Sequence, residues 1–393
     1  MAAYRKTLSW GASALLIVLW DGGALAAEWS VGGQVRERIA FDDNVRLVTE
    51  NEEAAIASIT TLDVDVGARA PTTVLNANIR LDKSVFIGAD GLDSFDQHLV
   101  ADGEHSIQRV TLSANAGFDR ETARTSEITD TGRTDVLAER IGLTLGAGAT
   151  YLVSEVDGVR VFANYSDVSF DTDELTDHTS YVAGVGWARL LTEATSLDSF
   201  VTASRFETGT GSPVESTIYG AQIGITHAFS ERLEIQVGAG VRHTSTDFVE
   251  AVGGSLVSRS RTATGFATDS RVSYRFERTT LEGSYVRDVS PSSAGQLLLK
   301  NTVSLSLRQR ATPVITFSFR GSYQENESAN LAANSANNDR KFWSVTPGAR
   351  WAFLPDWTAS ASYRYRSNQS GGSGRRAVSN AVRMAVTYRL PAR

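Results

Sequence analysis

Hydrophobic and polar residues alternate one by one along most of this chain. In the segment WTASASYRYR, residues 357–366, the odd positions hold Trp, Ala or Tyr and the even positions hold Thr, Ser or Arg. Similar alternation runs through residues 29–41, 75–81, 110–118, 233–242 and 297–308. Side chains of a β-strand point alternately to its two faces, so each segment is predicted to be a strand with one apolar and one polar face.

The connections between these expected strands are alternately long and short. Long polar segments are expected at 42–56, 88–96, 121–135, 171–178, 208–216, 246–262, 288–295, 325–338 and 367–376. Short links are expected at 71–73, 102–106, 154–158, 192–196, 230–232, 277–280, 310–313 and 354–356. Nine long loops and eight short turns join eighteen strands. Sixteen strands are the alternative if the short strand 97–103 and a neighbour do not form.

A strand with two such different faces suits the wall of a membrane barrel. In a bilayer every backbone polar group needs an internal partner, and a closed β-barrel is the only sheet that provides one. Bacterial outer-membrane barrels have even strand numbers, short periplasmic turns and long outer loops. We therefore predict an all-β fold, a transmembrane antiparallel outer-membrane β-barrel of about 18 strands. A secreted β-sandwich or β-solenoid, with the apolar face buried between sheets, is the alternative fold.

The N-terminal segment has the order of features found in a secretory signal peptide. Arg5 and Lys6 precede an apolar run, and small residues follow at 24–26. The apolar run is about 13 residues long, which is too short for a membrane-spanning helix. We expect residues 1–26 to be a cleaved signal peptide and residues 27–393 to form the barrel. This organisation predicts a location in the outer membrane of a Gram-negative cell.

The residues give no sign of catalytic chemistry. The chain has no cysteine, and its five histidines show no metal-ligand spacing. We predict a protein that is not an enzyme and needs no cofactor, with a barrel enzyme acting on lipid or glycan as an unfavoured alternative. One acidic loop is a weak candidate for Ca²⁺ binding, with a solvated loop as the simpler interpretation. Its residues are Asp171, Asp173, Glu174 and Asp177.

Charge is distributed unevenly between loops and strands. The chain has a net charge of −7, and the expected outer loops together are more negative than the whole chain, which leaves the strands and turns net positive. An Arg or Lys side chain facing lipid costs about 2–4 kcal/mol at the bilayer midplane, so most strand charges are expected to face inward. Inward acids are expected to be fewer: Asp63, Asp65, Glu234, Asp269 and Glu282. The proposed pore-lining residues are Arg36, Arg80, Arg242, Arg271, Arg308 and Arg364.

These inward arginines have two interpretations. A cationic lumen lowers the electrostatic barrier for anions and raises it for cations, which favours a path for an anionic solute or an acidic polysaccharide. Alternatively, the arginines pair with neighbouring acids and water and brace the barrel wall.

Four segments resemble a known protein family. They are FDDNVRL at 41–47, FIGADGLDSFDQHL at 86–99, FDRETARTSEITDTGR at 118–133 and DHTSYVAGVGWARLLTEATSLDSFVTASRFE at 177–207. They look like recurrent features of a β-barrel porin family of outer-membrane proteins. The resemblance covers most of the chain after residue 26. It implies an association with exopolysaccharide production and export, and it brings no catalytic motif.

The leading hypothesis is therefore a porin-like channel, or an accessory barrel, for export of an anionic exopolysaccharide or for an anionic solute. A non-conducting structural or receptor barrel that binds through its outer loops is the main alternative. Expected partners are outer-membrane lipid and lipopolysaccharide, the barrel assembly machinery, and in the leading hypothesis the polysaccharide and export-system proteins. No nucleic-acid partner is expected.

Overall fold

The computed structural model describes residues 27–130, 138–209, 214–252, 255–328, 339–370 and 374–391, and nearly all of them lie in eighteen strands. The strands of the first half are β1 (Glu28–Asp42), β2 (Ala55–Ala70), β3 (Thr73–Ile87), β4 (Ser94–Ile107), β5 (Val110–Thr122), β6 (Glu139–Leu152), β7 (Asp157–Phe170), β8 (His178–Thr192) and β9 (Thr195–Thr208). Those of the second half are β10 (Val214–Ala228), β11 (Leu233–Val252), β12 (Ser255–Arg275), β13 (Thr279–Ser292), β14 (Gln296–Arg310), β15 (Ile315–Ser328), β16 (Arg340–Leu354), β17 (Trp357–Ser370) and β18 (Arg376–Leu390). One helix, α1 (Ala123–Asp130), follows β5.

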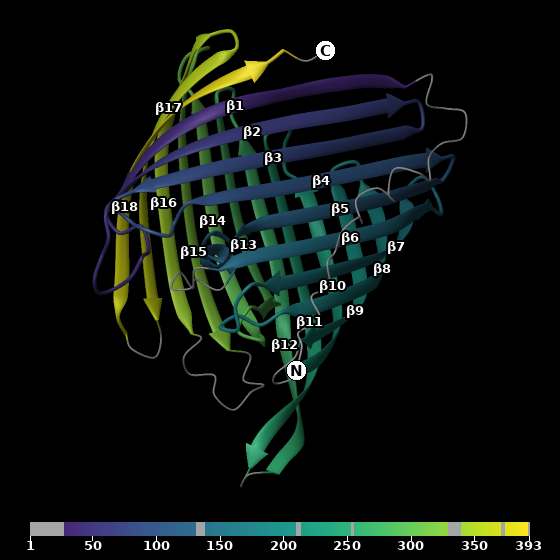
Figure 1. Ribbon diagram of the computed structural model, residues 1–393. Coiled ribbons are helices and arrows are strands. Elements are labelled where there is room, and N and C mark those ends of the chain that lie inside the picture. Colours follow the sequence, from purple (N-terminus) through teal and green to yellow (C-terminus); the bar gives the residue numbers. More distant parts are fainter. Residues whose placement is uncertain are drawn as a thin grey trace.

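The sheet closes on itself. Each strand pairs antiparallel with its neighbours in the sequence, and β1 pairs with β18 from Gly33–Leu390 to Asp42–Ala381. Figure 1 shows the strands as one tilted ring in which purple β1 lies beside yellow β18. Closure gives the first and last strands a backbone partner, as a barrel wall requires. The predicted eighteen-strand barrel is confirmed, and the sixteen-strand, sandwich and solenoid alternatives are wrong.

The two faces of each strand separate as the alternation predicts. In β17, Trp357 and Tyr363 lie on the outer face and are 39% and 42% exposed. Arg364 and Arg366 lie on the opposite face, toward the interior. Many other large apolar side chains are exposed on the outer face, among them Trp29, Ile39, Val201, Ile223, Val241, Trp351 and Met384.

Most of the predicted connections occur, and two were wrong. The segment 246–262, expected to be a long loop, is instead the hairpin of β11 and β12, which pairs up to Val252 and Ser255. Figure 1 shows this hairpin projecting well beyond the ends of the other strands. The segment 102–106, expected to be a turn, lies inside β4. The chain turns at 108–109 instead, where Gln108 has a positive φ of 49°.

Loops from several sides of the ring meet across one end of the barrel. Ser293, between β13 and β14, donates its hydroxyl hydrogen to Glu127 Oε2 in α1 at 2.6 Å. The carbonyl oxygen of the same Ser293 accepts from Thr176 N, between β7 and β8, at 2.7 Å. Because α1 follows β5, these contacts join strands on opposite sides of the ring. We call α1 and the loops 43–54, 171–177 and 293–295 the loop cap.

Apolar contacts fix the loop cap to the wall. Ile128 of α1 packs against Leu47 of the first loop, Phe342 of β16 and Ala377 of β18. Leu47 is 2% exposed and Phe342 is 7% exposed, so the contact is dry. The cap therefore lies against the inner side of the mouth.

No helix among the described residues is long and apolar enough to cross a bilayer.

One boundary between strands is incomplete. β12 pairs with β11 along its whole length, but with β13 only from Thr268–Arg287 to Arg275–Thr280. β13 nevertheless continues to Ser292 in its pairing with β14. Residues 255–267 of β12 and 288–292 of β13 therefore each have one edge without a strand partner. We call this stretch the seam.

Candidate functional site in the barrel interior

Positive charge covers one sector of the inner face, formed by β14 to β18 and β1. We call this sector the arginine wall. Its arginines share the polar face of their strands, opposite the exposed apolar residues of the outer face. They are Arg36, Arg38, Arg308, Arg320, Arg350, Arg364, Arg366, Arg383 and Arg389. Among the described residues of these six strands, Asp42 is the acid that pairs with them.

The upper half of the arginine wall is buried beneath the loop cap. Asp42 Oδ2 lies 2.8 Å from Arg366 Nη2 and 3.2 Å from Arg364 Nη2, and Ser379 Oγ donates to Asp42 Oδ1 at 2.6 Å. The side chains of Arg366 and Asp42 are only 4% and 8% exposed. One carboxylate therefore serves two guanidinium groups.

The remaining donors of this upper group are not fully used. The Nε atoms of Arg38, Arg364 and Arg366 are buried, and none has a hydrogen-bond partner within the described ranges. The charge of Arg383 is close enough to Arg38 and Arg366 for mutual repulsion. Buried donors and unbalanced cations are costly in a low-dielectric site, so this group attracts anionic groups.

The lower half of the arginine wall is open to the lumen. Arg350 lies within electrostatic range of Arg308, Arg36, Arg320 and Arg389, and each of them opposes its positive charge. Arg308, Arg320, Arg350 and Arg389 are exposed, and Arg36 is half-buried and donates from Nε to the Thr387 hydroxyl at 3.3 Å. Exposed cations that lie together on one side of the interior produce a positive local potential.

A neighbouring sector, formed by β2 to β5, has the opposite sign. We call it the acidic strip, and its residues lie on the polar face of these strands: Asp63, Asp65, Asp82, Asp96, Asp102, Glu104, Asp119 and Glu121. Asn78 Nδ2 donates to both Asp63 and Asp65 at 2.8 Å, and His98 Nδ1 lies 2.8 Å from Asp119 Oδ1. Inward acids are thus more numerous than the sequence predicts, although most belong to one sector.

The six arginines proposed as pore-lining all lie on the inner face, but in different settings. Arg36, Arg308 and Arg364 belong to the arginine wall. Arg80 pairs with Asp82 at 2.6 Å and Arg242 pairs with Asp288 at 2.7 Å, so these two arginines stabilise the strands of the barrel. Arg271 is exposed on β12. Their role in conduction stays a prediction.

Six arginines of the wall lie outside the pore-lining set proposed from the sequence: Arg38, Arg320, Arg350, Arg366, Arg383 and Arg389. Each lies on the polar phase of its strand, and Arg366 follows Arg364 by two residues in the alternating segment 357–366. The alternation was therefore a sufficient signal for Arg366. The electrostatic grouping of Arg320 and Arg389 with Arg350 depends on the pairing of β15, β16 and β18, which a single sequence does not show.

The loop cap adds a buried cation above the wall. Arg124 of α1 donates to the Val45 carbonyl at 3.3 Å, and its guanidinium carbon lies 5.6 Å from the Phe86 ring centroid. Burial lowers the pKa of Arg124, the neighbouring charge of Arg366 lowers it further, and Asp42 raises it. The charge of Arg124 in the helix therefore interacts with the charges of the upper half of the arginine wall.

The other sequence candidates give no additional site. In the acidic loop, Asp171 Oδ1 accepts from Glu139 N at 2.7 Å and Asp177 Oδ1 accepts from Phe170 N at 2.8 Å, so these carboxylates hold the backbone. Within the described residues, no group of three His, Cys, Asp or Glu could hold a metal ion.

Three histidines bond to threonine hydroxyl groups at 2.8–3.0 Å on the outer face. They are His105, His227 and His243. Groups that face away from the lumen are poorly placed for chemistry on a solute inside it.

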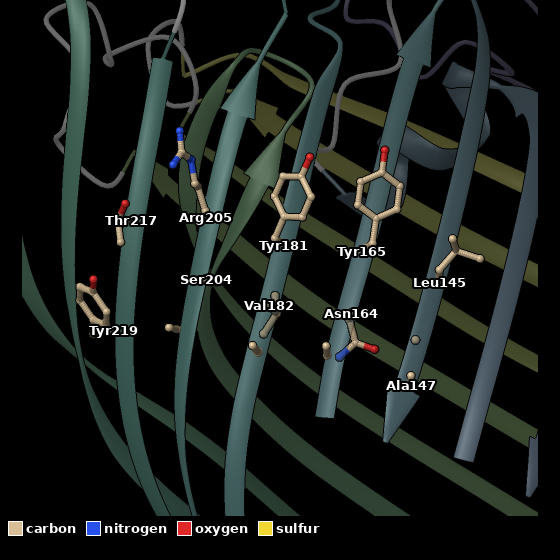
Figure 2. A pocket seen from close by; sticks show the side chains of 14 residues that line it. Leu145, Ala147, Asn164, Tyr165, Tyr181, Val182, Ser204, Arg205, Thr217 and Tyr219 are labelled. Carbon is tan, nitrogen blue, oxygen red and sulfur yellow. The ribbon is translucent and has the colours of Figure 1, made fainter. Parts of the chain in front are cut away.

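One concavity lies on the outer face, away from these charges. It is a shallow groove of about 660 Å³ whose floor includes Ala147, Ala163, Ala183 and Ala203, one in each of β6 to β9. Figure 2 shows Tyr165 and Tyr181 on adjacent strands with their hydroxyl groups pointing toward the same end of the groove, and their ring centroids lie 5.3 Å apart. Such a groove on an apolar outer face suits contact with lipid chains.

No protein-family model matches the chain. No curated protein matches it. The resemblance to an exopolysaccharide-associated family therefore stays a prediction.

Solved structures show likeness at low identity. The ferric citrate transporter FecA in its unliganded form is 9% identical, with a TM-score of 0.49 over 88% of this chain and 60% of FecA. OccAB3 of Acinetobacter baumannii is 11% identical, with a TM-score of 0.46 over 92% of this chain and 99% of that protein. OpdO of Pseudomonas aeruginosa is 14% identical, with a TM-score of 0.44 over 93% and 98%. The chain spans less than two thirds of FecA, and the strand pairing rather than these likenesses establishes the barrel.

Proposed function

We propose that this protein is a porin-like outer-membrane channel that prefers anionic solutes and has no enzymatic activity. The arginine wall supports this proposal most strongly, because it places a continuous row of cations along one side of the lumen. A charged lumen selects ions of opposite sign by lowering their barrier to entry. The apolar outer face and its exposed Trp and Tyr side chains support a position in the bilayer, in contact with lipid and lipopolysaccharide.

The cationic wall also fits a longer acidic substrate. Arg308, Arg350 and Arg364 lie on strands that run from one end of the barrel to the other, so successive charges of a polymer could contact successive arginines. We therefore propose an acidic exopolysaccharide as the larger substrate, together with export-system partners. This part of the proposal rests on the family resemblance as well as on the wall.

Flux through proteoliposomes tests the solute preference. The purified full-length barrel should release an acidic oligosaccharide at least about threefold faster than a neutral one of the same size. Equal rates would contradict the anion preference.

For the polymer, a strain lacking this gene should retain acidic polysaccharide in its periplasm, and normal secretion would contradict the export role.

The loop cap favours a second candidate, a barrel that binds through its outer loops without conducting. Contacts between α1 and the loop 293–295 cross the mouth, and Ile128 packs against the wall. Ser293→Ala removes the hydrogen bond to Glu127 without adding volume. In a conducting barrel this variant should raise the open probability, whereas a barrel that stays closed to all ions supports the receptor function.

A further inference from the structure

The barrel axis is not the only path by which a solute can pass the loop cap. The cap joins loops beside β1, β5, β7 and β13, so its contacts cross the mouth. In the part of the chain that the structure describes, none of the backbone hydrogen bonds between loops involves the projecting ends of β11 and β12. The same sector holds the seam, where β12 and β13 stop pairing above Thr268 and Arg287.

Side chains rather than backbone pairs hold the seam together on the inner side. Arg242 of β11 reaches past β12 to Asp288 of β13, with 2.7 Å between Nη1 and Oδ1. It passes beside Gly265, where a Cβ would lie in ordinary van der Waals contact, 3.6 Å from Arg242 Nη2. Asp288 Oδ1 also accepts from Val289 N at 2.7 Å, which satisfies an amide of the unpaired edge.

The outer side of the seam has a second side-chain contact. The guanidinium of Arg287 lies 4.6 Å from the ring centroid of Phe266, and its Nη1 donates to Asn301 at 2.8 Å. Phe266 and Tyr285 are exposed on the outer face, beside the last backbone pairs. Aromatic residues at such positions mark the membrane interface, so the unpaired stretch begins near the level of the lipid headgroups.

We propose that the seam is a lateral portal through which anionic solutes pass between the lumen and the medium beside the loop cap, and that the Arg242–Asp288 ion pair closes it. An ion pair with an exposed carboxylate contributes little to stability in water, and Asp288 is 64% exposed. Opening any other strand boundary would break a longer ladder of backbone hydrogen bonds. The portal rests on the proposed channel function, whose route it specifies.

Reversible cross-linking tests the portal directly. The chain has no native cysteine, so Ala263→Cys with Ser290→Cys can be joined specifically by a bifunctional thiosulfonate. Closing the portal should lower the flux of an acidic oligosaccharide at least about fivefold, and reductant should restore it. The matched control joins Thr226→Cys to Gln236→Cys, which also lie on the inner face, across the paired boundary of β10 and β11, and its flux should not change. A verified cross-link with unchanged flux overturns the portal.

Removal of the ion pair gives an independent test. Asp288→Asn should raise the flux about twofold, whereas Asp269→Asn, on the paired part of β12, should not. Unchanged flux in Asp288→Asn contradicts the proposed closure. A barrel that passes no solute at all would instead contradict the channel function.

Accessibility gives a readout that does not depend on transport. Asp288→Asn should speed the reaction of Ser290→Cys with a bulky maleimide in the medium at least about threefold. The same rate with and without Asp288 overturns the closure of the seam by this pair, whatever the conductance.

Discussion

The arginine wall and the acidic strip lie side by side on one inner surface, yet their charges have different surroundings. In the strip, Asp82 pairs with Arg80 and Glu121 pairs with Arg140. His98 lies beside Asp119, whereas Asp63 and Asp65 accept hydrogen bonds from the neutral amide of Asn78. In the lower part of the wall, Arg350 is surrounded electrostatically by other arginines. Charges that are already paired add little to the potential of the lumen, whereas unbalanced charges dominate it. We therefore predict that selectivity follows the less balanced wall rather than the total number of inward charges.

Neutralising the open half of the wall should have the largest effect on selectivity. Replacing Arg320, Arg350 and Arg389 together by Gln should lower the permeability of chloride relative to potassium at least about threefold. The measurement is the zero-current potential of the purified barrel in a salt gradient. The matched control replaces Arg160 and Arg271, inward arginines outside the wall, and should change the ratio much less. An equal change in both variants would remove the distinction between the wall and other inward arginines.

The single acid of the wall should matter for stability. Asp42→Asn leaves Arg364 and Arg366 buried without their counter-ion and should lower the free energy of unfolding by about 3 kcal/mol. The control Glu50→Gln breaks an exposed pair with Arg375 and should cost less than about 1 kcal/mol. Urea unfolding in detergent compares the two. Equal costs would mean that the upper wall is less dependent on Asp42 than its burial indicates.

Neutralising part of the acidic strip should have a smaller effect. Asp63→Asn with Asp65→Asn removes two carboxylates that both accept from Asn78, and the chloride preference should rise by less than about twofold. Zero-current potentials again provide the ratio. A larger rise than that caused by the wall variant would invert the proposed importance of the two sectors.

A single substitution in the wall should have the smallest effect. Arg36→Gln leaves Arg350 and the three exposed arginines near it in place, and salt of about 0.15 M screens charges beyond about 8 Å. The zero-current potential should therefore move only slightly. A complete loss of anion preference in this variant would show one binding site rather than a distributed wall.

Much of the fold was predictable because the membrane imposes a strict alternation on every strand. The exceptions lie where that constraint ends. In the projecting part of β12, residues 258–262 read Ser-Arg-Ser-Arg-Thr and are polar on both faces, so a real strand looked like a loop. In β4, the dipeptide Asp102-Gly103 resembled a turn, although the strand continues and Gln108 makes the turn.

The candidate site was predictable in its residue types but not in its grouping. Alternation places Arg364 and Asp63 on inner faces, but only strand pairing shows that they belong to sectors of opposite sign. Asp96 lies within an expected loop and Asp119 adjoins one, so their inward positions were missed. The helix α1 has eight residues, and contacts such as that of Ile128 with Phe342 fix its place through tertiary structure.

The zero-current potential of the unmodified barrel is the most direct test of the central claim. In a planar bilayer with a tenfold gradient of potassium chloride, the arginine wall predicts a potential whose sign corresponds to chloride preference. Replacing Arg320, Arg350 and Arg389 by Gln in the same experiment should move the potential toward potassium. A potential that already favours potassium in the unmodified barrel would contradict the account and leave the arginines as braces of the wall.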